Sequence, residues 1–495
     1  MKSEIRQSTI QNLLERTAKK RYSQYLMKVT LKHIRGFKNQ PVSFDFPVTA
    51  IIGPNGGGKT SVLGAAAIAY LSMPPRRFFA KGGKYDSSMQ DWSIEYELID
   101  RSVNAQDSFK RTASFKSSKW NRDALPRPVQ MFGINRTVPA NERKEYLKLA
   151  TSKFTVPDEQ VENLPREAVI AINRILGKDA SFYKRLKIHP KGDEFFLTGK
   201  TKNDDEYSEF HFGAGESSII RMVSLIELAP PESLILIEEL ENGLHPVATV
   251  RMTEYLVEVS DRKKIQVIFT THSDDALKIL PSQAIWVATN DRIFQGKLDI
   301  KSLRAITGET DPDSKLVIFV EDAFAKIWTS AILRQASNIA LDHIEIHSMK
   351  GDGTAVSINA HRKKDPSVMA PSICLIDGDS LQVENSSSGV FRLPGAAPES
   401  EVFDEVLAGW PKIGGKLSVA LLQRFEDDAR VKAICAQTRI TNMDTHLLFA
   451  QVGEKLGLIP EETVSQAFAN IYAQLKEHEI TAFLQPILKD LPREE

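Results

Sequence analysis

Residues 53–60 read Gly-Pro-Asn-Gly-Gly-Gly-Lys-Thr, which is a complete G-x-x-x-x-G-K-[ST] phosphate-binding loop. The apolar run of residues 48–52 comes directly before this loop, and a helix-forming stretch, residues 61–71, follows it. Such a loop turns its backbone N–H groups toward phosphate oxygens, while Lys59 reaches the β- and γ-phosphates and the Thr60 hydroxyl ligates Mg²⁺. The sequence therefore predicts a nucleotide site. Its candidate binding residues are Asn55, Gly56, Gly58, Lys59, Thr60 and Ser61.

The composition is that of an ordinary globular protein. A chain of 495 residues is long enough for about two to four domains, and 42% of its residues are hydrophobic. Basic and acidic residues number 64 each, so the net charge does not favour nucleic acid or membrane as a partner. We find no run of about 18 apolar residues and no secretory signal, and we expect no membrane contact. The two cysteines, Cys374 and Cys435, exclude a disulfide scaffold and fit a reducing compartment, so we expect a cytoplasmic protein.

Alternating strand and helix patterns predict an α/β fold with a mostly parallel sheet. After Pro281 the pattern restarts as a second, smaller α/β unit, and from Glu401 onward it is helical. The polar N-terminal stretch is either a docking helix for a partner or a helix that packs on its own domain. The predicted regions are an N-terminal helical extension (1–28), a nucleotide-binding domain (29–310), a smaller α/β domain (311–405) and a helical C-terminal region (406–495).

Two adjacent carboxylates end the most apolar of the predicted strands. Residues 234–237 read Leu-Ile-Leu-Ile, and Glu238 and Glu239 follow directly. The carboxyl ends of parallel strands open onto the ligand crevice of an α/β sheet. There the first acid can hold Mg²⁺ and the second can polarise the water that attacks a γ-phosphate. His272 lies at the tip of the next predicted strand and can sense that phosphate. A lone histidine in such a place is more often structural, but the spacing after Glu239 favours the phosphate role.

The order of these motifs resembles the ABC-type ATPases of the SMC/RecF/OLD group. Phe-Gly-Ala-Gly-Glu (residues 212–216) lies between the phosphate loop and the paired acids, and Asn-Gly-Leu-His-Pro (residues 242–246) follows them. Residues 31–38 are similar to the opening strand of that group, and the resemblance covers roughly residues 28–280. It implies ATP and Mg²⁺ as cofactors. It also implies a homo-oligomer, at least a head-to-head dimer, with ATP held between two copies.

The resemblance assigns a role to each motif residue. Thr60 and Glu238 would hold the metal, Glu239 would be the catalytic base and His272 the switch histidine. Two departures stand out: Gly213 replaces a usual serine, and Glu238 replaces a usual aspartate. We therefore expect slow hydrolysis with binding retained. The signature segment, which one copy presents to the nucleotide of the other, is marked by Gly213, Gly215 and Glu216.

A second acidic group falls in the smaller α/β domain. Glu321 directly follows one apolar strand, and Asp377 and Asp379 directly follow another. Acids at the ends of neighbouring parallel strands form a site for a divalent metal suited to phosphodiester chemistry, or they cap the strand ends. The arrangement resembles the TOPRIM domain of OLD-family nucleases. Asp322 and Ala325 stand where that family usually has a glycine and an aspartate. The missing aspartate argues against cleavage, although Glu399 and Glu401 could supply later acids.

Residues 108–127 combine basic and aromatic side chains. That mixture suits nucleic acid, because cations hold phosphate and rings stack on bases. A solvated hairpin has the same composition, and we favour that interpretation.

The family resemblance, with the missing TOPRIM aspartate and no long coiled coil, implies an ATP-dependent sensor and regulator in a prokaryotic antiphage defence complex. The ATPase subunit of Septu systems is similar in its ATPase core, reduced TOPRIM-like unit and helical tail. That resemblance implies a separate HNH nuclease partner, with DNA or another nucleic acid bound through the complex. One alternative is a self-sufficient OLD-family endonuclease that cuts DNA with the TOPRIM-like acids. Another is a RecF-like DNA repair ATPase, which leaves the second acidic group unexplained.

Overall fold

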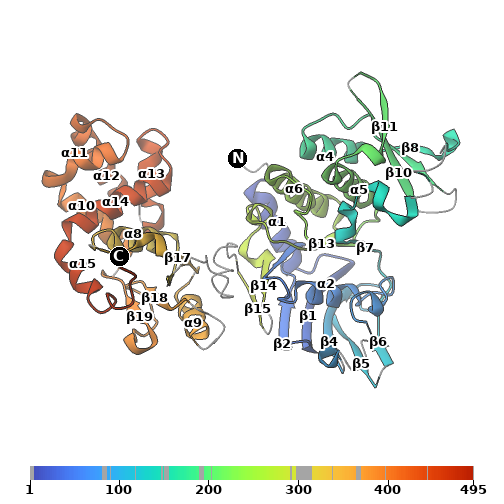
Figure 1. The fold of residues 1–495 in the computed structure, drawn as a ribbon, viewed down its shortest axis with the longest axis horizontal. Coiled ribbons are helices and arrows are strands. Elements are labelled where there is room, and N and C mark those ends of the chain that lie inside the picture. Colours follow the sequence, from blue (N-terminus) through green and yellow to red (C-terminus); the bar gives the residue numbers. More distant parts are fainter. Residues whose placement is uncertain are drawn as a thin grey trace. The chain divides into compact units, whose positions relative to one another are not determined.

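The apolar strand patterns form four sheets in the part of the chain that the computed structural model describes. That part is residues 5–493 apart from 81–85, 90, 118, 147–148, 150–154, 189–193, 202, 290–291, 297–314, 337, 350, 364–369, 396 and 443. The chain divides into two compact units, residues 1–297 (unit 1) and 298–495 (unit 2) (Figure 1). The predicted domain boundary at residue 310 lies outside the described residues.

A six-stranded sheet carries the motifs of unit 1, in the strand order β15-β14-β3-β13-β12-β7. Its neighbouring strands are parallel except for the β14–β15 pair. The residues of β3, β12, β13 and β14 are all buried, which explains why these strands read as continuous apolar runs. The strands are β3 (Val48–Ile52), β7 (Val129–Phe132), β12 (Leu234–Ile237), β13 (Gln266–Thr270), β14 (Ile285–Ala288) and β15 (Ile293–Gln295).

Helices cover both faces of this sheet. Figure 1 shows α5 and α6 on one side and α2, with a second sheet beyond it, on the other. The second sheet is antiparallel, in the order β2-β1-β4-β5-β6. Its strands are β1 (Gln24–Ile34), β2 (Phe37–Ser43), β4 (Ser93–Asp100), β5 (Phe109–Lys116) and β6 (Lys119–Arg122). The helices of unit 1 are α1 (Gln7–Ala18), α2 (Lys59–Ala67), α4 (Arg166–Leu176), α5 (Ala214–Leu228) and α6 (Pro246–Lys263).

The N-terminal helix α1 packs on unit 1. Ile10 and Leu13 are buried, and Arg16 forms an ion pair of 2.7 Å with Asp261 of α6. This packing supports the second of the two alternatives for the N-terminal stretch. Strand β1 begins at Gln24, before the predicted domain start at residue 29, because Tyr25 is already fully buried.

A third sheet forms a lobe of unit 1 that the sequence did not reveal. Its strands are short and follow the order β11-β10-β9-β8, all antiparallel. They are β8 (Val161–Asn163), β9 (Lys184–Lys187), β10 (Phe195–Lys200) and β11 (Glu206–Ser208). Short 3-10 helices join the elements of unit 1: Pro75–Arg77, Ser87–Met89, Ile134–Thr137 (η4), Ala140–Glu142, Lys144–Tyr146, Asp158–Gln160, Glu209–His211 (η8), Asp274–Leu277 and Ser282–Ala284.

Unit 2 combines a four-stranded parallel sheet, in the order β17-β16-β18-β19, with many helices. One hydrophobic cluster runs from Leu316 to Leu491, so the sheet and the C-terminal helices share a core. The predicted boundary at residue 405 falls inside α10. The strands are β16 (Leu316–Val320), β17 (Ile344–Ser348), β18 (Ser372–Ile376) and β19 (Val390–Arg392). The helices are α8 (Ala323–Leu333), α9 (Asp352–Arg362), α10 (Pro398–Ala408), α11 (Trp410–Ala420), α12 (Asp428–Thr441), α13 (Leu448–Lys455), α14 (Glu461–Leu475) and α15 (Glu477–Leu484), with 3-10 turns at Leu341–His343, Ser386–Ser388, Phe425–Asp427 and Thr445–Leu447.

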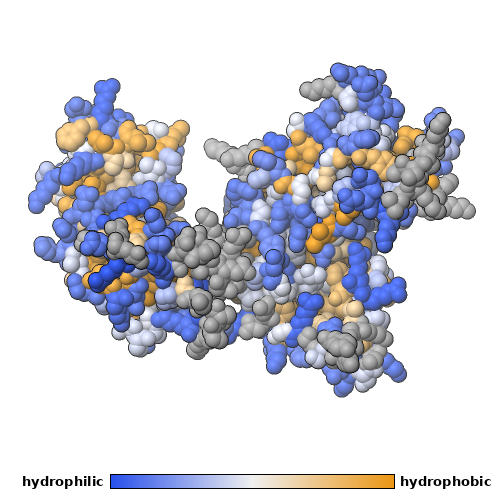
Figure 2. All heavy atoms as spheres, in the orientation of Figure 1, coloured by the Kyte–Doolittle hydropathy of each residue, from blue (hydrophilic) through white to orange (hydrophobic). Residues whose placement is uncertain are grey.

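The surface mixes polar and apolar residues. Figure 2 shows hydrophobic residues interspersed among hydrophilic ones on the viewed face of each unit. Large apolar side chains that are exposed in the C-terminal helical region include Val419, Leu422, Phe425 and Ile440. No helix among the described residues is long and apolar enough to cross a membrane.

Candidate functional site

The phosphate loop lies between β3 and α2, and close packing of its backbone requires its glycines. Gly58 is the N-cap of α2 with a φ of +97°, and a Cβ there would lie 2.4 Å from the ring of Phe37. A Cβ on Gly53 would lie 2.1 Å from the carbonyl oxygen of Ala288. Both positions exclude any larger residue, since real Cβ atoms do not approach so closely. The loop is therefore held against β14 and the start of β2.

Lys59 is buried, and its ammonium donates to the carbonyl oxygens of Gly53 and Pro54, both at 2.9 Å. These bonds hold the charge over the loop, where a phosphate would bind. Asn55, Gly56 and Thr60 are exposed, whereas Gly58 and Ser61 are buried. The Ser61 hydroxyl has no hydrogen-bond partner among the described residues. The predicted binding residues thus lie in one continuous segment, made of the loop and the first turn of α2, with both exposed and buried members.

The paired acids follow β12 at the carboxyl end of the sheet, as the strand pattern predicts. Strand β13 lies between β12 and β3 and is parallel to both, so the acids and the phosphate loop follow strands that end at the same edge of the sheet. Glu238 is half-buried, and burial raises the pKa of its carboxyl. Glu239 has a φ of +46°, and its backbone N–H donates to the Thr270 hydroxyl at 2.8 Å. A positive φ is uncommon for a residue with a side chain, so its surroundings must hold this backbone.

The turn after the acids is joined to the segment that carries His272. The Glu241 carboxylate accepts hydrogen bonds from the backbone N–H of His272 and from the Thr271 hydroxyl, both at 2.6 Å. His272 is half-buried at the tip of β13. Glu241 and Thr270 were not among the predicted site residues. Their roles depend on contacts between segments about 30 residues apart, which no local sequence pattern reveals.

The signature segment begins helix α5. Gly213 is its N-cap and is exposed, so a side chain there has room. Gly215 packs so closely on the following loop that a Cβ would lie 2.1 Å from the carbonyl oxygen of Gly243. Glu216 accepts a hydrogen bond from the Tyr183 hydroxyl and pairs with Lys178 at 2.6 Å. The segment is thus fixed to its own chain at both Gly215 and Glu216, and its role toward a second copy is a proposal.

A buried arginine that sequence analysis also missed lies beside the acids. Arg136 of η4 donates to the carbonyl oxygen of Glu238 at 2.6 Å, to that of Glu239, and to that of Gly133 at 3.1 Å. Burial lowers its pKa to about 10, which still leaves it charged at neutral pH. No local motif marks this arginine, since its partners at the two acids lie 102 and 103 residues along the chain.

The basic and aromatic hairpin, β5 and β6, uses much of its charge internally. Arg111 pairs with Asp123 at 2.8 Å, and Arg122 donates to several backbone carbonyls, including that of Met73 at 2.6 Å. Phe115 is buried against Trp92. These contacts agree with a solvated hairpin rather than a nucleic-acid surface. The exposed cations of the hairpin are Lys110, Lys116 and Lys119.

In unit 2 the structure brings Glu321, Asp377 and Asp379 together at the carboxyl ends of β16 and β18. Burial, reinforced by neighbouring carboxylates, raises the pKa of Glu321 to about 7 and that of Asp377 to about 8. One buried oxygen of each has no hydrogen-bond partner among the described residues. Within that same part of the chain, no group of three or more histidine, cysteine, aspartate or glutamate side chains is arranged to hold a metal ion. The described residues therefore show no assembled metal site at these acids.

Asp322, one of the two residues that depart from the TOPRIM pattern, has a structural role. Asp322 is the N-cap of α8, and its carboxylate accepts from the backbone N–H of Ala325 at 2.8 Å. Glu399, a later acid near this group, pairs with His446 at 2.7 Å. A cavity of about 590 Å³ adjoins Asp322, Glu399 and His446.

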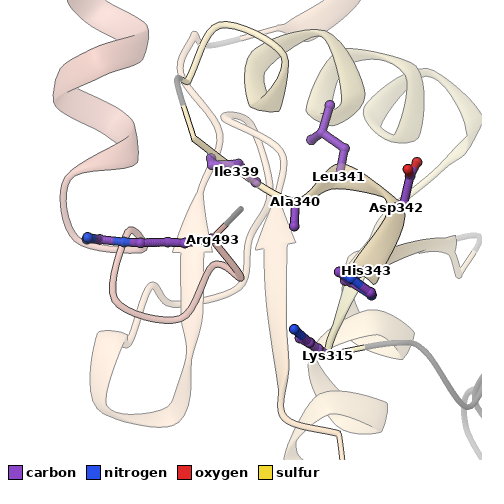
Figure 3. Close-up of a pocket in the computed structure, with 7 residues that line it drawn as sticks. All are labelled: Lys315, Ile339, Ala340, Leu341, Asp342, His343 and Arg493. Carbon is purple, nitrogen blue, oxygen red and sulfur yellow. The ribbon is translucent and has the colours of Figure 1, made fainter. Parts of the chain in front are cut away.

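A hollow of about 580 Å³ lies at the opposite, amino ends of β16 and β17 (Figure 3). It collects basic side chains, but Figure 3 shows the Arg493 side chain extended away from Lys315 and His343. The hollow is therefore separate from the acids and does not converge on one ligand position. It is lined by Lys315, Ile339, Ala340, Leu341, Asp342, His343 and Arg493.

Residues 48–278 match a family whose description reads "AAA domain, putative AbiEii toxin, Type IV TA system". Proteins of curated function give no match. Among solved structures, the SMC head domain from Thermotoga maritima is 14% identical, with 55% of this chain and 99% of that chain covered and a TM-score of 0.36. An Smc head domain with an extended coiled coil from Pyrococcus furiosus, bound to part of ScpA, is 12% identical, with coverage of 58% and 99% and a TM-score of 0.37.

A third similar structure is cbiO1 from Clostridium perfringens, part of an ABC transporter complex, at 13% identity, coverage of 56% and 90%, and a TM-score of 0.27. The family match over residues 48–278 spans the phosphate loop, the paired acids and His272. Together with the strand order that brings them to one edge, this match supports a P-loop ATPase domain over residues 48–278.

Proposed function

We propose that this chain is the ATP-hydrolysing sensor and regulator of a prokaryotic antiphage defence complex, similar to PtuA of Septu systems. In this proposal a separate HNH nuclease cuts DNA or another nucleic acid, and the nucleotide state of unit 1 controls that cutting. The complex would be cytoplasmic. Lys59, Thr60 and Glu238 would hold ATP and Mg²⁺, Glu239 would activate water, and His272 would contact the γ-phosphate.

The proposal rests on the acids of unit 2, where one expected acid is missing and another caps a helix. Ala325 stands where a TOPRIM nuclease would place an acid, and the carboxylate of Asp322 caps helix α8. Glu321 and Asp377 have raised pKa values because they are buried beside other carboxylates. A reduced acidic site in the same chain as a phosphate loop and paired acids suits a regulator that depends on another protein for cleavage.

The proposal includes a composite ATP site. Gly213 and the start of α5 are accessible, so this segment can face the nucleotide of a second copy. With glycine at that position, the segment offers backbone N–H groups but no side-chain hydroxyl. We therefore propose at least a head-to-head dimer with slow hydrolysis. Mass photometry of the Glu239→Gln variant with ATP and Mg²⁺ should detect the dimer, whereas a monomer that hydrolyses ATP at the full rate would refute the composite site.

The direct test of the regulator role is a cleavage assay. The purified chain is incubated with DNA, ATP and either Mg²⁺ or Mn²⁺, with and without a candidate HNH nuclease from the same genome. We expect cleavage only with the nuclease present, and we expect Lys59→Ala to change that cleavage. Robust cutting by the chain alone that disappears in Asp377→Ala would overturn the proposal.

A second candidate function is a self-contained nuclease. The observation that favours it is the pair of buried carboxylate oxygens on Glu321 and Asp377 that have no hydrogen-bond partner among the described residues. Acids placed in this way can take a divalent cation, which would offset their mutual repulsion. Binding of Mn²⁺ measured by calorimetry, lost in Asp377→Asn and kept in Glu239→Gln, would support this candidate.

A further inference from the structure

Arg136 is placed to hold the backbone of both acids at the end of β12. The arginine lies in η4, directly after the edge strand β7, and its side chain is buried. Its two terminal nitrogens donate to consecutive carbonyl oxygens, one to that of Glu238 and the other to that of Glu239. A planar guanidinium can bridge two acceptors in this way, whereas a lysine ammonium cannot reproduce the fork.

The backbone that Arg136 holds is in an unusual conformation. Glu239 has a φ of +46°, which points its side chain in a direction that an ordinary strand end would not allow. Two hydrogen bonds hold the backbone of Glu239: its N–H donates to the Thr270 hydroxyl, and its carbonyl oxygen accepts from Arg136. The direction of the Glu239 carboxylate therefore depends on both partners.

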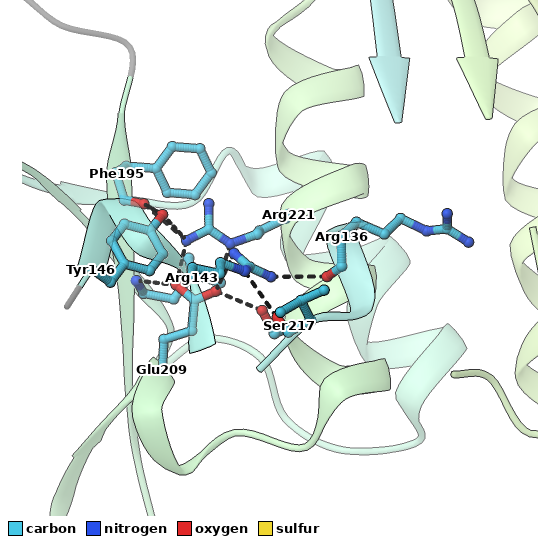
Figure 4. Close-up of polar contacts among 9 residues, drawn as sticks. Arg136, Arg143, Tyr146, Phe195, Glu209, Ser217 and Arg221 are labelled. Carbon is cyan, nitrogen blue, oxygen red and sulfur yellow. Dashed lines mark hydrogen bonds and ion pairs between the residues drawn. The ribbon is translucent and has the colours of Figure 1, made fainter. Parts of the chain in front are cut away.

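The position of η4 is fixed in turn by a buried polar network (Figure 4). Arg143 donates to the carbonyl oxygen of Arg136 at 2.9 Å and pairs with Glu209 at 3.4 Å. The Glu209 side chain is fully buried and accepts from Ser217 at 2.6 Å and from Arg221, both on helix α5. Figure 4 shows the Arg136 side chain pointing away from this network, toward the other side of η4. The network thus joins η4 to the helix that begins with the signature segment.

We propose that Arg136 is a positioning residue for ATP hydrolysis. It sets the direction of the Glu239 carboxylate through the backbone, and the network of Arg143, Glu209 and Arg221 transmits the position of helix α5 to it. This inference rests on the proposed role of Glu239 as the base. Because the described hydrogen bonds of Arg136 all go to backbone carbonyl oxygens, its loss should slow the chemical step and leave ATP binding intact.

The test compares the kcat for ATP hydrolysis with the Kd for ATP in Arg136→Ala and Arg136→Lys. We expect kcat to fall on the order of 10²-fold in both variants, as for a misplaced catalytic group, while Kd changes less than about twofold. Added guanidinium or methylguanidinium should restore part of the kcat of Arg136→Ala, because it can occupy the vacated position. Arg136→Lys keeps the charge and most of the side-chain volume, so its kcat still tests the inference if Arg136→Ala does not fold.

Arg127 supplies a matched control. It is equally buried, and its guanidinium donates to Glu232, Tyr70 and Gln266, away from the acids. Arg127→Ala should lower the thermal stability without a rescue of kcat by guanidinium. An unchanged kcat in Arg136→Lys, or a loss of ATP binding in step with kcat, would overturn the inference. Glu239→Gln in the same assay separates the two ideas: if that variant hydrolyses ATP normally, the proposed base fails; if it is inactive while Arg136→Lys is not, only this inference fails.

Discussion

The carboxylate of Glu241 accepts a hydrogen bond of 2.6 Å from the backbone N–H of His272. This bond joins the turn after the paired acids to the tip of the neighbouring strand, so the expected base and the expected switch histidine belong to one connected edge. The second carboxylate oxygen of Glu241 accepts from the Thr271 hydroxyl, which reinforces the same connection. The two tips should therefore keep their relative positions while nucleotide binds.

Replacing Glu241 by alanine should disconnect these tips. The N–H of His272 and the hydroxyl of Thr271 would lose a charged acceptor, and hydrogen bonds of this kind contribute about 1.5–3 kcal/mol each. We expect a lower melting temperature for unit 1 and a reduced rate of ATP hydrolysis, measured by differential scanning fluorimetry and phosphate release. Glu241→Gln keeps one acceptor oxygen and should lose less of both. Equal losses in the two variants would show that the charge, not the connection, matters.

Lys59→Ala should abolish the stabilisation that nucleotide gives. Ligand that binds only the folded state adds RT ln(1 + [L]/Kd), about 2.7 kcal/mol at 100 times Kd. ATP with Mg²⁺ should therefore raise the melting temperature of the wild-type chain and leave that of Lys59→Ala unchanged. Lys278→Ala removes an exposed lysine paired with Asp275 and should respond to ATP as the wild type does. A wild-type response in Lys59→Ala would place the nucleotide elsewhere.

The stability of unit 2 should depend on pH through Asp377 and Glu321. Their folded-state pKa values, about 8 and about 7, lie above those of an unfolded chain, so the folded protein binds more protons between roughly pH 4 and 8. Stability present at low pH is then lost as the pH rises through the folded-state values, by at most about 1.4 kcal/mol per pH unit for each group. Asp377→Asn should flatten this slope in urea titrations with a chelator present. An unchanged slope would contradict the burial of this carboxyl.

Much of the site in unit 1 could be predicted because its chemistry lies in contiguous residues. The phosphate loop, the acids after Ile237 and His272 each follow an apolar run, and that run alone predicts a buried strand with its tip at the ligand edge. Arg136 could not be found in this way. It contacts the acids through their two carbonyl oxygens, which lie more than 100 residues away along the chain. A backbone acceptor leaves no pattern in the sequence.

The lobe of short strands and the acids of unit 2 show two other limits of the sequence. Strands β8 and β11 have three residues each, which is too short for an alternation of apolar and polar residues to be recognised. The positions of Glu321 and Asp377 followed from the strand pattern, whereas their raised pKa values arise from burial beside acids of other segments. The TOPRIM-like character of this unit stays a prediction.

The role of Glu239 as the base is tested by the rate of phosphate release from the wild-type chain and from Glu239→Gln, with ATP binding measured in parallel. We predict slow, Mg²⁺-dependent hydrolysis by the wild type. In Glu239→Gln, removal of a general base should slow it about 10²- to 10⁴-fold with ATP still bound. Hydrolysis at the wild-type rate in Glu239→Gln would contradict the account, because the acid at the end of β12 would then not be the group that activates water.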